Sequence, residues 1–127
     1  MKNLIVVGNV CNNLQMTYDA IKHVADEHKV SSVCFGSRKE TLTAVEGQAH
    51  LFANHNDIHA FDASINIPKR KAFSLPVSPM NRIFEKSKKW ASDNVMLVLH
   101  TGDLSNYSSV IKKAVRAKMS VITRQVE

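Results

Sequence analysis

Three short polar segments could bind an anion, because each follows an apolar run and precedes a helical pattern. They are residues 8–13, 36–39 and 101–106. Glycine lets the backbone turn tightly there, and the first N–H groups of the following helix, with the positive end of its dipole, favour a phosphate or carboxylate. The segments therefore predict an anion site, although an ordinary strand-to-helix turn has a similar composition.

Two of these segments carry further binding groups. Residues 36–39 add a hydroxyl, a guanidinium and an ammonium group, which can hold a phosphate by charge-assisted hydrogen bonds. Residues 101–106 are mostly small and polar and are the leading candidate. The ligand-binding residues predicted from the three segments are Gly8, Asn9, Gly36, Ser37, Arg38, Thr101, Gly102, Asp103, Ser105 and Asn106.

Catalysis would need an acid, a base or a nucleophile at the same places. Asp103 and Asp62 could act as nucleophile or base in the cleavage of an N-glycosidic bond, and His100 could exchange a proton near neutral pH. A polar loop histidine without a catalytic role is the simpler interpretation of His100. The polar segments contain no strong acid/base pair, which favours binding over turnover.

Metal and thiol chemistry have less support. His50, His55 and His59 are predicted to lie on a helix end, a turn and a strand, so one metal ion could not easily collect them without further ligands. Cys34 has apolar neighbours, which predicts a buried thiol, whereas Cys11 would begin a helix but has no identifiable base beside it. We therefore predict no metal and no cofactor.

Apolar periodicity predicts the elements that must position these groups. Strands are expected at residues 4–7, 32–35, 58–62, 95–99 and 120–123. Helices are expected at residues 14–28, at 39–54, from Ser78-Pro79 to residue 91, and after Ser105-Asn106. In the last helix the inward stripe comprises Tyr107, Val110, Ile111, Ala114 and Val115.

The order of these elements predicts an α/β fold. Strands 4–7 and 95–99 are apolar throughout, as expected for central strands covered on both faces. Strands that alternate with helices form parallel sheets, because parallel neighbours need a right-handed crossover. We therefore predict a three-layer Rossmann-like sandwich with a five-stranded, mainly parallel sheet, whose carboxyl edge gathers the polar segments. Residues 63–77 lack a helical period and are expected to form a two-stranded flap or a functional loop.

Length and charge limit the class of protein. A chain of 127 residues fits a single domain, and no apolar run approaches the roughly 20 residues of a membrane span. The apolar start is too short for a secretory signal, so a cytoplasmic location is expected. Residues 1–67 hold five Lys/Arg against seven Asp/Glu, whereas residues 68–127 hold twelve against four. The basic half, which includes Lys69-Arg70-Lys71, predicts an anionic partner, and a solvated basic surface is the alternative.

One run of features has the order found in a known family. Asn81-Arg82 opens a helical pattern, and a hydrophobic strand, the turn Thr101-Gly102-Asp103, a further helix and the last strand follow. In this order and spacing, residues 79–123 resemble the SLOG superfamily of Rossmann-like nucleotide-binding domains, and Gly36-Ser37-Arg38 falls where that family has its second glycine-rich turn. The resemblance implies a pocket lined by Asn81, Arg82, Thr101, Gly102 and Ser105.

The same comparison bears on activity. The hydrolase branch of the family has a Pro-Gly-Gly-x-Gly-Thr-x-x-Glu motif, whereas residues 101–109 contain one glycine and no glutamate. The first function that we consider is therefore binding, by sensing or sequestration, of a nucleotide or nucleotide-derived small molecule. The alternatives are an N-glycosidic-bond hydrolase or transferase acting on nucleotides, and a single-stranded nucleic-acid-binding protein. Small domains of this type often place the pocket at a subunit interface, so a homo-oligomer is expected.

Overall fold

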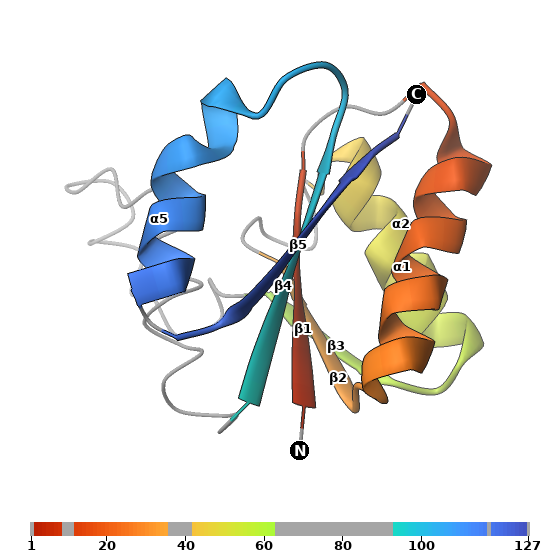
Figure 1. Ribbon diagram of the computed structural model, residues 1–127. Helices are drawn as coiled ribbons and strands as arrows, with labels where there is room; N and C mark the ends of the chain where they lie inside the picture. The colour runs from red at the N-terminus through yellow and green to blue at the C-terminus, as the bar shows by residue number, and fades with distance from the viewer. Residues whose placement is uncertain (1, 9–11, 36–41, 63–92, 117, 127) are drawn as a thin grey trace, which may run out of the picture.

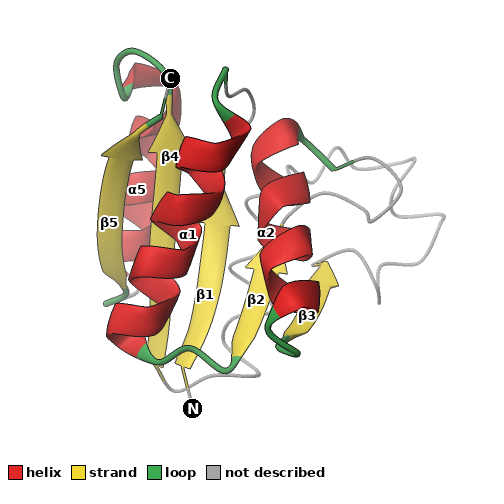
Figure 2. Ribbon diagram, turned by 90° about the vertical axis from the view of Figure 1, so that its right-hand side faces the viewer, coloured by secondary structure: helices red, strands yellow, loops and turns green. Residues whose placement is uncertain are grey.

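The computed structural model describes residues 2–8, 12–35, 42–62, 93–116 and 118–126. Its strands are β1 (Lys2–Val7), β2 (Ser32–Phe35), β3 (His59–Asp62), β4 (Asp93–His100) and β5 (Ser120–Gln125). Its helices are α1 (Leu14–His28), α2 (Ala44–His55) and α5 (Ser108–Arg116), with a short 3-10 turn, η2 (Ser105–Tyr107), before α5. Figure 1 shows the sheet nearly edge-on between the helices, and Figure 2 shows its strands side by side.

The described strands form one parallel sheet in the order β3-β2-β1-β4-β5. In the centre, Leu4 of β1 lies in register with Val33 of β2 on one side and Val95 of β4 on the other. From β1 the chain builds outward to β2 and β3, and then returns to the other side of β1 for β4 and β5. The direction of strand addition therefore reverses between β1 and β4.

Helices cover both faces of this sheet. α1 and α2 lie on one face and α5 lies on the other (Figures 1 and 2). Alternate residues of each central strand enter different cores, because side chains along a strand point to opposite faces. Leu4 and Leu97 pack with α1 and α2, whereas Ile5 and Met96 pack with α5. The predicted three-layer Rossmann-like sandwich is confirmed.

The bounds of two elements differ from the prediction. α2 was expected from residue 39, but it begins at Ala44, because Thr43 forms a capping box with Glu46 and has extended backbone angles. β5 continues to Gln125, two residues beyond its predicted end, and the Val126 N–H extends the pairing by donating to the His100 carbonyl at 2.8 Å. This extension brings one more cation to the carboxyl edge.

The prediction is wrong for one residue of the inward stripe of α5. Val110 and Ala114 of α5 are buried as expected, but Val115 is 60% exposed. A turn of 3.6 residues rotates Val115 about 100° from Ala114, beyond the width of the stripe that the sheet covers. The Cys34 thiol is buried, as predicted.

Several predictions fall on residues outside the described ranges. They are the flap or loop at 63–77 with Lys69-Arg70-Lys71, the helix that starts at Ser78-Pro79, and the helix-terminal Cys11. Among the helices that the structure describes, none is long and apolar enough to cross a membrane.

Candidate functional site

The carboxyl ends of β1 and β4 meet where the strand order reverses. At this edge the chain leaves β1 toward α1 and leaves β4 toward α5, so the two helices begin at the same end of the sheet, on opposite faces (Figure 1). Such a reversal leaves a crevice at the strand ends in open α/β sheets. The described groups at this edge come from Gly8, residues 100–105 and the end of β5.

Gly8 is required by packing at this edge. A Cβ atom there would lie 2.7 Å from the Leu99 carbonyl oxygen and 2.8 Å from Cγ1 of Val45. The glycine thus lets the end of β1 lie directly against β4 and α2. We predicted Gly8 as a turn that admits a ligand, and the contacts give it a structural role that is independent of any ligand.

Thr43 joins the start of α2 to the same strand end. Its hydroxyl donates to the Gly8 carbonyl at 2.7 Å and accepts from the Glu46 N–H at 3.1 Å. The Thr43 N–H in turn donates to the Glu46 carboxylate at 3.1 Å. The N-terminus of α2 is therefore held beside the end of β1. Thr43 was not among the predicted site residues, although the Thr-x-x-Glu spacing is a recognisable capping signal.

His100 is held in one orientation at the end of β4. Its Nδ1 lies 2.7 Å from the Gly102 carbonyl oxygen, and the residue is only 9% exposed. A carbonyl only accepts hydrogen bonds, so Nδ1 carries a proton and Nε2 is the nitrogen that can accept one from another group. Gly102 has a φ of 79°, which favours glycine and closes the turn under the imidazole.

Asp103 is already engaged within its own turn. Its Oδ1 accepts from the Ser105 hydroxyl at 2.6 Å and from the Ser105 N–H at 2.9 Å. The Ser105 hydroxyl is the main cause that lowers the pKa of Asp103; the Ser105 N–H and the nearby His100 lower it further. Asp103 is therefore an exposed carboxylate at neutral pH, which suits a hydrogen-bond acceptor or base and not a general acid.

The arrangement also changes what this turn can bind. The Ser105 N–H, which an incoming anion could have used, already serves the Asp103 carboxylate. A phosphate placed here would meet a like charge. The exposed Thr101 remains available as a hydroxyl group, and the turn as a whole suits the hydroxyl groups of a sugar better than a phosphate.

Arg124 is a cation at this edge that sequence reasoning missed. It lies in register with Leu99, whose carbonyl faces Gly8, and it is exposed. Along β5 it shares the α1 face with Ile122 and Val126, whereas His100 at the end of β4 alternates to the α5 face. The predicted strand stopped at residue 123, and that error kept Arg124 out of the predicted site.

The three candidate catalytic residues are not all together. His100 and Asp103 lie in one turn, but Asp62 ends β3, which is three strands from β4. At the usual spacing of neighbouring strands, that is about 14 Å across the sheet. Asp62 and Asp103 therefore do not form a carboxylate pair.

Six residues and one further side chain of the predicted ligand set fall outside the described part of the chain. The side chain of Asn106 and all of the following lie outside the described residues: Asn9, Gly36, Ser37, Arg38, Asn81 and Arg82. Of the predicted ligand set, the structure therefore brings Gly8, Thr101, Gly102, Asp103 and Ser105 to one edge of the sheet.

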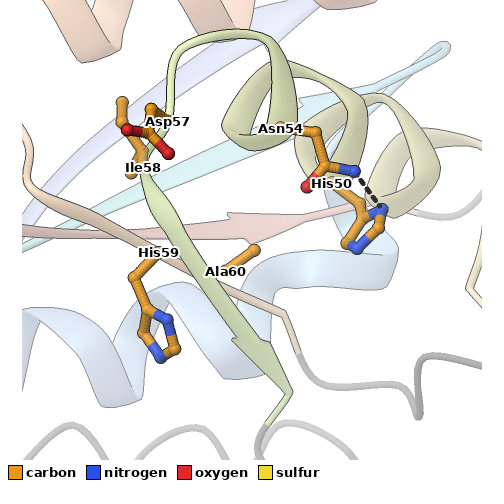
Figure 3. A pocket seen from close by; sticks show the side chains of 6 residues that line it. All are labelled: His50, Asn54, Asp57, Ile58, His59 and Ala60. Atoms are coloured by element: carbon orange, nitrogen blue, oxygen red, sulfur yellow. Dashed lines mark hydrogen bonds between the residues drawn. The ribbon is translucent and has the colours of Figure 1, made fainter.

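A hollow lies away from this edge, between α2 and β3. Its volume is about 440 Å³, and His50, Asn54, Asp57, Ile58, His59 and Ala60 line it (Figure 3). His55 is not among them, because its Nδ1 lies 2.9 Å from the Tyr18 hydroxyl on α1. Within the described ranges, no group of three or more His, Cys, Asp or Glu side chains could hold a metal ion.

Comparisons with known proteins add no relative. No protein-family model, curated protein or solved structure matches this chain.

Proposed function

We propose that the protein binds a nucleotide or nucleotide-derived small molecule at the carboxyl edge of the sheet, between β1 and β4. The observation that carries the proposal is the reversal of strand order at this point, with small residues and helix N-termini gathered around it. A place in the SLOG superfamily is part of the same proposal, and it rests on the sequence resemblance of residues 79–123.

The charges at the edge suggest how such a ligand would lie. Arg124, on the α1 face, offers a guanidinium to a phosphate, whereas Asp103 repels one. The Asp103 carboxylate and the Thr101 hydroxyl can instead hydrogen-bond the hydroxyls of a ribose. We therefore place the phosphate on the Arg124 side of the edge and the sugar on the Asp103 side.

Binding is favoured over turnover by the state of the candidate catalytic groups. One oxygen of Asp103 is occupied by Ser105, and Asp62 is three strands away. A hydrolase acting at an N-glycosidic bond would need a poised base or nucleophile beside the scissile bond. Assays of free base released from nucleotides test this alternative, and a loss of release in Asp103→Ala with unchanged binding would support it.

Thermal shift with matched probes tests the binding proposal. AMP, ADP, NAD, cyclic AMP and adenosine are each added at 50 and 300 mM salt. A ligand at ten times its Kd stabilises the folded state by about 1.4 kcal/mol, which raises the melting temperature by a few degrees. If no nucleotide raises it, the proposal fails.

The Arg124→Ala variant sharpens the test. Losing a charge-assisted hydrogen bond should lower the affinity for phosphate-bearing ligands by about tenfold or more and leave the affinity for adenosine unchanged. Arg116→Ala, which removes an exposed arginine from α5, is the control and should change neither. Light scattering of the same samples, with and without nucleotide, tests the expected homo-oligomer.

A further inference from the structure

Residues 104–126 carry an unusual charge pattern. They contain five Lys/Arg and no Asp/Glu. Lys112 and Arg116 are exposed on α5, and Lys118 is exposed in the turn that follows. These three residues define a basic stripe. Of the other two cations, Lys113 is exposed about 100° around the helix from Lys112, and Arg124 belongs to the carboxyl edge described above.

Helix stability explains only part of this stripe. Cations in the last turn of a helix interact favourably with its dipole, which accounts for Arg116. Lys112 lies one turn earlier, and a like charge four residues from Arg116 is destabilising. On α1 the exposed Lys22 instead lies three residues after Asp19 and four before Asp26, and His23 lies 3.6 Å from Glu27. The basic stripe lacks such compensation along α5 and β5, whose described residues include no acidic side chain.

An apolar side chain lies within the stripe. Val115 is 60% exposed, the largest exposure among the large hydrophobic residues that the structure describes. On a helical wheel Lys112, Val115 and Arg116 fall within an arc of about 100°. An exposed apolar group beside two cations matches a partner that offers regularly spaced negative charges beside apolar surface.

We propose that the basic stripe binds the phosphodiester backbone of nucleic acid. Lys112 and Arg116 are about 6 Å apart along the helix axis, and phosphates along a duplex strand rise about 3.4 Å each. The stripe with Lys118 therefore spans two or three phosphates, and Val115 can contact a sugar or base beside them. An acidic protein surface would supply the charges without this regular spacing, so nucleic acid is the better match.

The test measures how binding depends on salt. Fluorescence anisotropy of a labelled 20-nucleotide oligothymidine and of a 20-base-pair duplex is recorded from 50 to 300 mM salt. Three neutralised phosphates on a single strand give a slope of about −2 for log K against log salt. In Lys112→Glu/Arg116→Glu the slope should become less steep by about 1.4, and the affinity at 50 mM salt should fall at least tenfold. The two probes decide whether the single strand or the duplex is preferred.

A charge-matched pair provides the control. Lys22→Glu/Lys29→Glu makes the same change in net charge on exposed residues of α1 and its C-terminal cap, on the opposite face of the sheet. It should alter affinity by less than threefold, because separated surface charges are screened at these salt concentrations. An equal loss in both double variants would show attraction by net charge only, and would overturn the stripe as a site.

Two competitions separate this proposal from others. Polyglutamate of equal charge should not displace the oligonucleotide, and equal displacement would assign the stripe to acidic proteins. AMP should not displace it either, since displacement would assign oligonucleotide binding to the carboxyl edge. AMP binding itself should persist in Lys112→Glu/Arg116→Glu, so the two proposals can fail separately. If the glutamate variant fails to fold, Lys112→Gln/Arg116→Gln gives the same comparison.

Discussion

The two ends of the sheet differ in how far their polar side chains are buried. At the amino end, Asn3 of β1 is 1% exposed, accepts from the Ser32 hydroxyl at 2.9 Å and donates to Asn94 at 3.3 Å. These three residues lie opposite one another on β2, β1 and β4. At the carboxyl end, Thr101, Gly102 and Asp103 are all exposed.

The difference separates polar groups that specify the fold from polar groups that can meet a ligand. The row at the amino end links three strands in one register, and a slip of one residue would leave a buried amide without its partners. The carboxyl edge has its own internal hydrogen bonds, and His100 is buried there, but the polar groups of the turn at 101–105 face solvent. Changes at the amino end should therefore affect stability, and changes at the carboxyl turn should affect binding.

The largest effect is expected at Gly8, whose role at the carboxyl edge is packing. In Gly8→Ala the new methyl group must displace the Leu99 carbonyl or Val45, so stability should fall by about 3 kcal/mol in urea unfolding. Gly47→Ala is the control, because nothing lies within 4 Å of its added Cβ. A helix-interior alanine there should stabilise by about 0.5–1 kcal/mol. Equal stability of Gly8→Ala and the wild type would refute the close packing of β1 on β4.

The buried row should give the next largest effect. Asn3→Ala removes a partner of the Ser32 hydroxyl and of the Asn94 amide, so we expect the free energy of unfolding to fall by about 2 kcal/mol. Thr101→Ala, an equally small truncation at the open edge, should change stability by less than about 0.5 kcal/mol. Equal losses of stability in Asn3→Ala and Thr101→Ala would contradict the difference between the two edges.

Thr43 tests the link between α2 and the carboxyl edge. Thr43→Ala loses the helix cap and the hydrogen bond to the Gly8 carbonyl, so the free energy of unfolding should fall by about 1.5 kcal/mol. Thr43→Ser keeps both hydroxyl bonds and should recover most of that loss. If serine does not restore stability, the methyl group and not the hydroxyl holds α2 in place.

The fold was largely predictable because its strongest signals are local. The continuous apolar runs at 4–7 and 95–99 became the two central strands, and the spacing along 14–28 became α1 with Asn13 as its cap. The errors came where another signal competed with periodicity. The capping pair Thr43 and Glu46, readable in the sequence, overrides the apolar spacing that had extended α2 back to residue 39.

The candidate site was less predictable because it depends on neighbours distant in sequence. The contact of Gly8 with Leu99 and Val45 follows from strand order and helix placement, which one glycine in a turn cannot reveal. Arg124 reaches the edge only through the register of β5 with β4. In contrast, a serine two residues after Asp103 is a common local hydrogen-bonding pattern, and its effect on the anion site could have been predicted.

The smallest expected effect concerns the pH dependence of the carboxyl turn. The pKa of Asp103 is lowered in the folded protein, chiefly by the Ser105 hydroxyl, so its contribution to stability is complete above the unfolded pKa of about 3.9. That contribution is lost as pH falls through the lower, folded pKa. In Ser105→Ala the Asp103 pKa should rise toward its ordinary value, as followed by NMR titration of the carboxyl carbon.

The matched control for this titration is Ser108→Ala, which removes a hydroxyl bonded to the Ser105 carbonyl and leaves the Asp103 carboxylate with both of its donors. It should leave the Asp103 titration unchanged. An Asp103 pKa that stays low in Ser105→Ala would assign the shift to the Ser105 N–H and the nearby His100 instead. Since either cause keeps the carboxylate ionised, the hydroxyl decides only how strongly Asp103 is held in its own turn, and therefore how readily it can turn toward a bound sugar.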